Sequence, residues 1–145
     1  MPSFNSDAVG AVAVIKDSSG SVSVEEFTQF WGETCAVARE TMPQRLILMQ
    51  CDTEVQDVKI FEDYEDIEET ECVIKGRGGT SFHPAITKVV EEFPDVEVII
   101  YLTDLGSDEF GEEPEIPVLW ISTVRNEEAP WGETVYLLPE NKDEQ

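Results

Sequence analysis

Short apolar runs alternate with longer amphipathic stretches along this chain. Continuous apolar runs of strand length, typical of buried strands in a parallel sheet, occur at residues 11–15, 46–49, 96–102 and 117–121, with a last short one at 133–138. Residues 55–61 mix apolar and charged side chains, as edge strands do. We expect this segment to pair antiparallel with the strand before it.

Two stretches carry apolar residues at spacings of three and four and predict helices. The first begins at a capping box, Ser23 to Glu26, and ends near Pro43. Its predicted buried face comprises Val24, Phe27, Trp31, Cys35 and Ala38. The second follows the glycine-rich loop 76–80, and its predicted buried face comprises Phe82, Ile86, Val89 and Phe93, with Pro84 in the first turn. Residues 62–71 and 105–116 are expected to be acidic loops, and residues 72–74 a short apolar element.

This order of elements predicts an α/β fold: a doubly wound, mainly parallel sheet with one antiparallel edge strand and helices on both faces. One Rossmann-like domain should span residues 1–140, followed by a frayed acidic tail at 141–145. Right-handed crossovers place strand 11–15 beside strand 96–102. The chain changes direction across the sheet at that junction, and ligands of such sheets bind there.

Charge and cysteine content narrow the possible functions. The net charge of −23, from 32 acidic and 9 basic residues, argues against binding to nucleic acid or to anionic membranes. No apolar stretch has the roughly 18 residues of a membrane span, and the N-terminal residues do not resemble a signal peptide. Three cysteines without a Cys-x-x-Cys motif fit a reducing cytoplasm, where we expect Cys35, Cys51 and Cys72 to be small buried hydrophobes.

Oxygen-bearing side chains should meet at the predicted strand junction. Asp17, Ser19 and Ser21 follow the first strand, Thr80 lies in the glycine-rich loop, and Asp104 follows strand 96–102. Each motif alone is typical of a turn or a helix cap. Together they offer hard oxygen ligands for a divalent cation such as Mg²⁺, or Mn²⁺ or Ca²⁺, with one position open to a carboxylate from another molecule.

This combination resembles the metal-ion-dependent adhesion site (MIDAS) of von Willebrand factor type A (VWA) domains. A narrower resemblance is to the VWA-like C-terminal domain of bacterial proteins classed as metal-dependent peptidases. It is carried by residues 17–21, 50–55, 76–80 and 101–104, with further matches at 117–120 and 131–133. The resemblance implies a doubly wound fold, a Mg²⁺-type cation and binding to other proteins.

Two features depart from that family. Lys16 precedes the metal-site Asp, where the family usually has an apolar residue, so its amine must reach solvent or find an acid. The peptidases also carry an upstream His-Glu-x-x-His zinc helix, which this chain cannot build because His83 is its one histidine. We therefore expect no inherited peptidase activity, and the chain to be a lone domain or a C-terminal half.

The leading hypothesis is a protein-binding module whose cation, held by the five residues, accepts an Asp or Glu of a partner. Asp52, at the end of strand 46–49, is a candidate behind the direct ligands. A second hypothesis is a hydrolase that uses His83 or Asp52 with the cation, although no nucleophile is evident. A third is an acidic decoy that mimics nucleic acid through its acidic loops.

Overall fold

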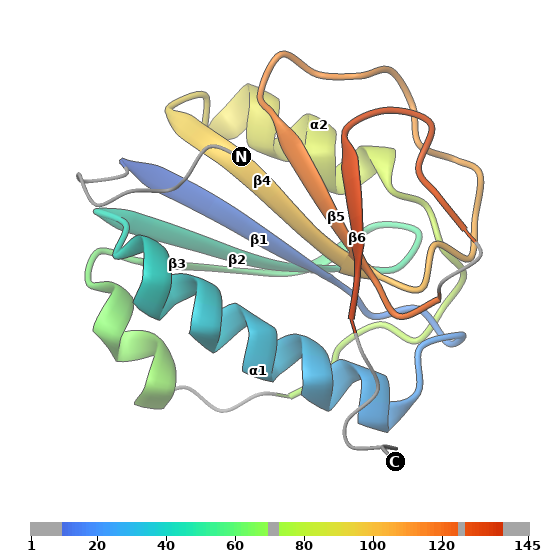
Figure 1. Ribbon diagram of the computed structural model, residues 1–145, viewed down its shortest axis with the longest axis horizontal. Coiled ribbons are helices and arrows are strands. Elements are labelled where there is room, and N and C mark those ends of the chain that lie inside the picture. Colours follow the sequence, from blue (N-terminus) through green and yellow to red (C-terminus); the bar gives the residue numbers. More distant parts are fainter. Residues whose placement is uncertain (1–9, 70–72, 125–126, 138–145) are drawn as a thin grey trace.

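The computed structural model describes residues 10–69, 73–124 and 127–137, and these form a six-stranded sheet with helices on both faces (Figure 1). The elements in chain order are β1 (Ala11–Asp17), α1 (Val24–Thr41), β2 (Arg45–Cys51), β3 (Val55–Phe61), the 3₁₀ helix η1 (Tyr64–Glu69), α2 (His83–Glu92), β4 (Val96–Thr103), β5 (Val118–Ser122) and β6 (Glu133–Tyr136). The expected tail at 141–145 and residues 1–9 lie outside the described residues.

The strand order is β3-β2-β1-β4-β5-β6. All neighbouring strands are parallel except β2 and β3, which pair antiparallel. The antiparallel edge strand is therefore confirmed. The predicted position of the first strand beside strand 96–102 is confirmed as well. The chain builds outward from β1 in one direction and from β4 in the other, so their junction is the expected switch point.

Alternating side chains of β1 divide the core into two layers. Ala11, Ala13 and Ile15 pack in the layer under α2, while Val12 and Val14 pack in the layer under α1. Figure 1 shows α1 and α2 on opposite faces of the sheet. Because both faces are covered, all seven residues of β1 are buried, which explains its unbroken apolar run up to Lys16.

The start of α1 follows the sequence prediction. Ser23 Oγ accepts a hydrogen bond from the Glu26 amide at 3.0 Å, and the Glu26 carboxylate accepts one from the Ser23 amide at 2.8 Å. The other carboxylate oxygen of Glu26 accepts from the Thr123 hydroxyl at 2.7 Å, which ties the helix start to the end of β5. The helix ends at Thr41, and its C-cap residue Met42 has a left-handed φ of 44°, which directs the chain away before Pro43.

The predicted buried face of α1 is partly wrong. The buried residues are Phe27, Phe30, Thr34, Ala38 and Thr41. Val24 is 68 % exposed, whereas Thr34 is buried because its hydroxyl donates to the Phe30 carbonyl at 2.7 Å. A polar residue whose hydrogen bond is satisfied within its own helix can face the core, and an apolar/polar pattern cannot detect this.

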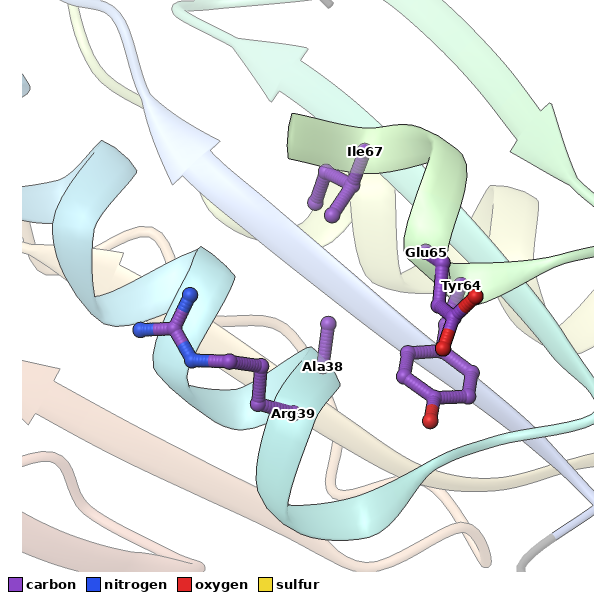
Figure 2. A pocket seen from close by; sticks show the side chains of 5 residues that line it. All are labelled: Ala38, Arg39, Tyr64, Glu65 and Ile67. Carbon is purple, nitrogen blue, oxygen red and sulfur yellow. The ribbon is translucent and has the colours of Figure 1, made fainter. Parts of the chain in front are cut away.

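The segment after β3 also differs from prediction. Residues 64–69 form η1 rather than a loop, and Ile67 is buried against α1. Tyr64 and Ile67 lie three apart and so on the same side of a 3₁₀ turn, a period hidden among acidic residues. A cleft of about 430 Å³ between α1 and η1 is lined by Ala38, Arg39, Tyr64, Glu65 and Ile67 (Figure 2).

The expected apolar element at 72–74 does not form a strand in its described part. Val73 and Ile74 lie in a connecting segment without regular secondary structure, with Val73 half exposed, while Cys72 lies outside the described residues. The second predicted helix is confirmed as α2, with Phe82, Ile86 and Val89 buried.

Candidate metal centre

The centre of the candidate site is the carboxylate of Asp17, the last residue of β1. The parallel pairing of β1 with β4 brings it next to Thr103, the last residue of β4. Asp17 Oδ2 accepts a hydrogen bond from the Thr103 hydroxyl at 2.5 Å, and this hydroxyl in turn accepts from the Leu105 amide at 3.0 Å. Two strand ends are thus joined at the carboxylate, and Thr103 is a contact that the sequence reasoning did not identify.

The two serines of the Asp-x-Ser-x-Ser turn converge on the same point. Asp17 Oδ1 accepts from the Ser19 amide at 2.9 Å and from the Ser19 hydroxyl at 2.5 Å. Ser19 Oγ lies 3.2 Å from Ser21 Oγ. Neighbouring ligands of an octahedral Mg²⁺ lie about 3 Å apart, given Mg–O distances near 2.1 Å, so the two hydroxyls have a separation that suits one cation. Ser19 is buried and Ser21 exposed, so the arrangement opens toward solvent.

Asp104 provides a second carboxylate at this edge of the sheet. Its Oδ1 accepts from the Gly106 amide at 3.0 Å, and the residue between them, Leu105, has a left-handed φ of 56°. A Cβ on Gly106 would lie 3.0 Å from Asp104 Oδ1 and 3.5 Å from Ser21 Oγ. Asp104 Oδ1 and Ser21 Oγ therefore line the same small space beside this strained turn.

The electrostatics of Asp17 favour a cation. Burial raises the pKa of Asp17, and the negative charge of Asp104 raises it further, while hydrogen bonds from Ser19 and Thr103 lower it without cancelling the rise. A buried carboxylate facing another carboxylate is unfavourable when ionised, and a divalent cation bound between them would relieve both effects. The donor set of carboxylates and hydroxyls matches the hard ligands that Mg²⁺ prefers.

The loop that carries Thr80 is docked against the Asp-x-Ser-x-Ser turn. The Arg77 amide donates to the Ser18 carbonyl, and the Gly20 amide donates to the Gly78 carbonyl, both at 2.8 Å. Thr80 lies two residues beyond Gly78 and is half-buried. Among the described residues, the Thr80 hydroxyl makes no hydrogen bond to Asp17, Ser19 or Ser21. The fold thus brings the loop to the site, and Thr80 is the predicted ligand with the least direct placement.

Asp52 organises this loop. Its Oδ1 accepts from the Glu54 amide at 3.1 Å and from Gln56 Nε2 at 2.9 Å, and its Oδ2 accepts from the Gly78 amide at 2.9 Å. Burial alone would raise the pKa of Asp52, but these hydrogen bonds outweigh it and lower the pKa. Its described hydrogen bonds all go to the loop and to its own turn and strand. Any influence on a cation therefore passes through the loop that carries Thr80.

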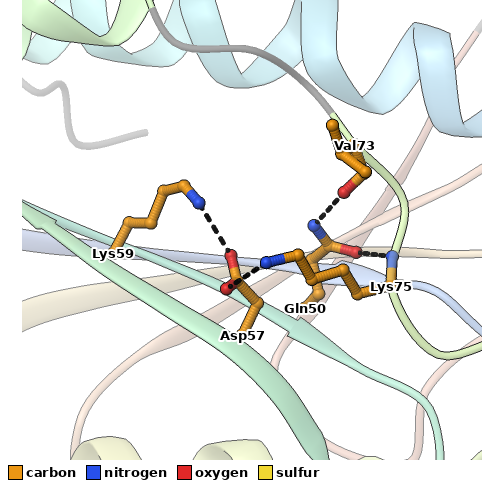
Figure 3. Close-up of polar contacts among 5 residues, drawn as sticks. All are labelled: Gln50, Asp57, Lys59, Val73 and Lys75. Carbon is orange, nitrogen blue, oxygen red and sulfur yellow. Dashed lines mark hydrogen bonds and ion pairs between the residues drawn. The ribbon is translucent and has the colours of Figure 1, made fainter.

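Gln50 lies on β2, two residues before Asp52, and holds the backbone that leads into the same loop. Its side chain donates to the Val73 carbonyl at 2.7 Å and accepts from the Lys75 amide at 2.6 Å (Figure 3). Lys75 also pairs with Asp57 on β3 at 3.2 Å, as does Lys59 at 3.3 Å. Gln50 lies in the stretch 50–55 that carries the family resemblance, but no role was predicted for its side chain. Its period-two spacing from Asp52 could have suggested that both side chains face one neighbour.

A glycine at position 76 is required by close packing. Its φ is 121°, and a Cβ there would lie 2.8 Å from Ser18 Oγ and 3.0 Å from Asp52 Oδ2. The glycine-rich loop therefore packs tightly against both the turn after β1 and the turn after β2, although its glycine content is typical of a flexible loop.

With this geometry established, comparison with known proteins gives the family. A family profile described as "VWA-like domain (DUF2201)" matches residues 12–138. The chain belongs to this family. No curated protein matches it significantly.

Solved structures share the fold of this VWA-like domain. An aerotolerance-related membrane protein from Bacteroides fragilis NCTC 9343 aligns with a TM-score of 0.57 at 14% identity, over 78% of this chain and 67% of that chain. Proximal thread matrix protein 1 from the mussel byssus aligns with a TM-score of 0.59 at 17% identity, over 80% of this chain. The alignment covers only 37% of the mussel protein, and at these identities the likeness concerns the fold alone. Within the described residues, the VWA-like domain has no helix both long and apolar enough to cross a lipid bilayer.

Other candidates in the VWA-like domain have structural explanations. Phe110 stacks on Phe82 with ring centroids 4.7 Å apart, and the Trp131 indole donates to the Gly111 carbonyl at 3.1 Å. The middle of loop 105–116 is therefore held against the core, and Trp131 contributes to packing. His83 is exposed at the start of α2. Lys16 stays buried, with its ammonium 4.4 Å from the Trp31 ring centre.

Two cysteines can be compared with prediction, and Cys72 lies outside the described residues. Cys51 is buried as expected, and burial raises its pKa to about 11. Cys35 is only partly buried, contrary to expectation. Among the described residues, no cluster of three or more His, Cys, Asp or Glu is arranged for a metal. A cation in this domain would instead depend on hydroxyl ligands beside two carboxylates.

Proposed function

We propose that this VWA-like domain binds partner proteins through a divalent cation, Mg²⁺ or Mn²⁺ or Ca²⁺ in its place, held by Asp17, Ser19, Ser21, Thr80 and Asp104. An Asp or Glu carboxylate of the partner would take the open coordination position. The observation that carries the proposal is the convergence of Asp17, Ser19 and Ser21 within hydrogen-bond distance at the switch point of the sheet. The narrower kinship with the C-terminal domain of metal-dependent peptidases belongs to the same proposal.

The charge of the chain makes the cation necessary for this function. A net charge of −23 repels a partner carboxylate, and the candidate site itself contains two acids. A bound divalent cation would cancel the charges of these two acids and offer a coordination position, so partner binding should require the cation. The buried thiol of Cys51, which forms no disulfide within the described residues, fits a reducing compartment such as the cytoplasm.

The decisive experiment is a calorimetric titration of Mg²⁺ and Mn²⁺ into the wild type, Asp17→Ala, Asp104→Asn and Asp108→Asn. Asp108 is an exposed acid four residues beyond Asp104, so its variant removes the same charge from the same loop. We expect saturable binding that weakens about tenfold or more in Asp17→Ala and Asp104→Asn but changes little in Asp108→Asn. Near-UV circular dichroism should show that each variant is folded.

Two results would contradict the proposal. One is equal weakening in Asp104→Asn and Asp108→Asn, which would indicate a diffuse ion atmosphere around an acidic surface. The other is full binding by a folded Asp17→Ala variant. The carboxylate step is tested separately by adding acetate to the ¹⁵N-labelled domain at constant ionic strength. Amide shifts around residues 17–21 should appear with Mg²⁺ present and not with EDTA.

A further inference from the structure

We propose that Arg77 is a second anchor for the partner carboxylate. One oxygen of that carboxylate would bind the cation, and the other would accept a hydrogen bond from the Arg77 guanidinium. The inference rests on the proposed function and adds a residue that determines ligand specificity. Arg77 is exposed in the glycine-rich loop, and its guanidinium Nη1 donates to the Ser19 carbonyl at 3.3 Å. It therefore lies on the residue whose hydroxyl and amide both bind Asp17.

The backbone holds Arg77 in this place at a conformational cost. Its φ of 79° lies in the left-handed region, which is unfavourable for a residue with a side chain. The Arg77 amide donates to the Ser18 carbonyl at 2.8 Å, and Asp52 binds the amide of the next residue, Gly78, at 2.9 Å. Strain fixed by hydrogen bonds on both sides presents this side chain at the mouth of the candidate site.

Arg77 has donors available for an anion. A guanidinium has five N–H groups, and the described contact to Ser19 uses one of them. Within the described residues, Lys59 and Lys75 pair with Asp57, and Lys88 pairs with Glu92. Among the residues that the structure describes, Arg77 contacts a carbonyl and no carboxylate. Its planar fork suits a carboxylate better than an ammonium would.

The local charge shows what Arg77 adds. A divalent cation would cancel the charges of Asp17 and Asp104 and leave no net attraction for an incoming anion. Arg77 adds one positive charge at the mouth of the loaded site. The same charge repels the metal, so its removal should affect the two ligands in opposite directions: the cation should bind more tightly and the carboxylate more weakly. A residue that only shaped the loop would weaken both when replaced.

The test compares Arg77→Gln, Arg77→Lys and Arg39→Gln. Arg39 is in the last turn of α1, about 20 Å along the helix from the end near the site, and its variant changes the net charge equally. Mn²⁺ affinity is measured by calorimetry, and acetate affinity by amide shifts of the Mg²⁺-loaded protein. We expect Arg77→Gln to weaken acetate about fivefold and to strengthen Mn²⁺ about twofold. Arg77→Lys should keep the metal affinity and weaken acetate partly, and Arg39→Gln should match the wild type.

The outcomes separate this inference from the proposed function. If the wild type binds both Mn²⁺ and acetate but Arg77→Gln leaves acetate unchanged, or weakens both ligands together, Arg77 is not an anchor and the metal-dependent module stands. If the wild type binds no cation, or binds it without responding to acetate, both proposals fail.

Discussion

Replacement of Asp52 by Asn tests whether one carboxylate holds the glycine-rich loop. An Asn side chain keeps one acceptor oxygen for Glu54 and Gln56 but places an NH₂ group where Oδ2 accepts from the Gly78 amide. The Gly78 amide then loses its partner, and the two remaining hydrogen bonds lose their ionic character. A lost or unsatisfied bond to a charged, buried group costs about 1–3 kcal/mol, so we expect the free energy of unfolding to fall by about 2 kcal/mol.

The assay is urea unfolding followed by tryptophan fluorescence, with Asp57→Asn as control. Asp57 is a partly exposed acid on β3 whose ion pairs with Lys59 and Lys75 should contribute less than about 1 kcal/mol. A decrease below about 0.5 kcal/mol in Asp52→Asn, or one equal to that of Asp57→Asn, would refute the reasoning. Mn²⁺ affinity should fall in Asp52→Asn alone, because the loop that it releases carries Thr80.

The pH dependence gives an independent check of the same prediction. The folded-state pKa of Asp52 is lowered from its ordinary value of 3.8. Its stabilising contribution is therefore fully present above the unfolded-state pKa and is lost as the pH falls through the lower folded-state value. The difference in stability between wild type and Asp52→Asn should be constant from pH 6 to pH 7 and should shrink below about pH 4. A difference that grew in acid would have the wrong sign.

Two further predictions concern packing and reactivity. Gly76→Ala should lower the free energy of unfolding, measured in urea, by about 2 kcal/mol, because of the φ of 121° and the nearby Ser18 Oγ. Gly32→Ala should raise it by about 0.5–1 kcal/mol, because nothing lies within 4 Å of a Cβ at that helical position. Equal effects would contradict the tight packing of the glycine-rich loop. Cys51 has a pKa of about 11, so at pH 8 it should react with iodoacetamide about 100-fold more slowly than an ordinary thiol. Peptide mass spectrometry measures this rate, with the partly exposed Cys35 for comparison.

The sequence predicted the sheet because burial leaves a clear pattern. Strands covered on both faces need continuous apolar runs, and a capping box marks a helix start, so β1, β4 and the start of α1 were identified correctly. The 3₁₀ helix was missed because Tyr64 and Ile67 carry its packing, and their three-residue spacing is hidden among acidic residues. Thr34 was missed because its polar group is satisfied within its own helix.

Predictability of the candidate site depends on whether a residue acts through its chemistry or through its position. Asp17, Ser19 and Ser21 stand in a short motif, and the structure brings their oxygens together. Thr103 and Gln50 act through contacts with residues 86 and 23–25 positions away, and such distances leave no local pattern. The placement of Arg77 depends on a left-handed φ that its neighbours impose, which composition does not reveal.

The bond between Asp17 and Thr103 has a consequence for how the domain is made. It joins positions 86 residues apart, and the bond from Arg77 to Ser19 spans 58. At a synthesis rate of about 5–20 residues per second, Asp17 would leave the ribosome roughly 4 to 17 seconds before Thr103. A nascent chain that already displays the whole Asp-x-Ser-x-Ser motif still lacks its partners, and so would an excised peptide. The hydrogen bonds that build the candidate site can thus be complete only once translation has passed β4.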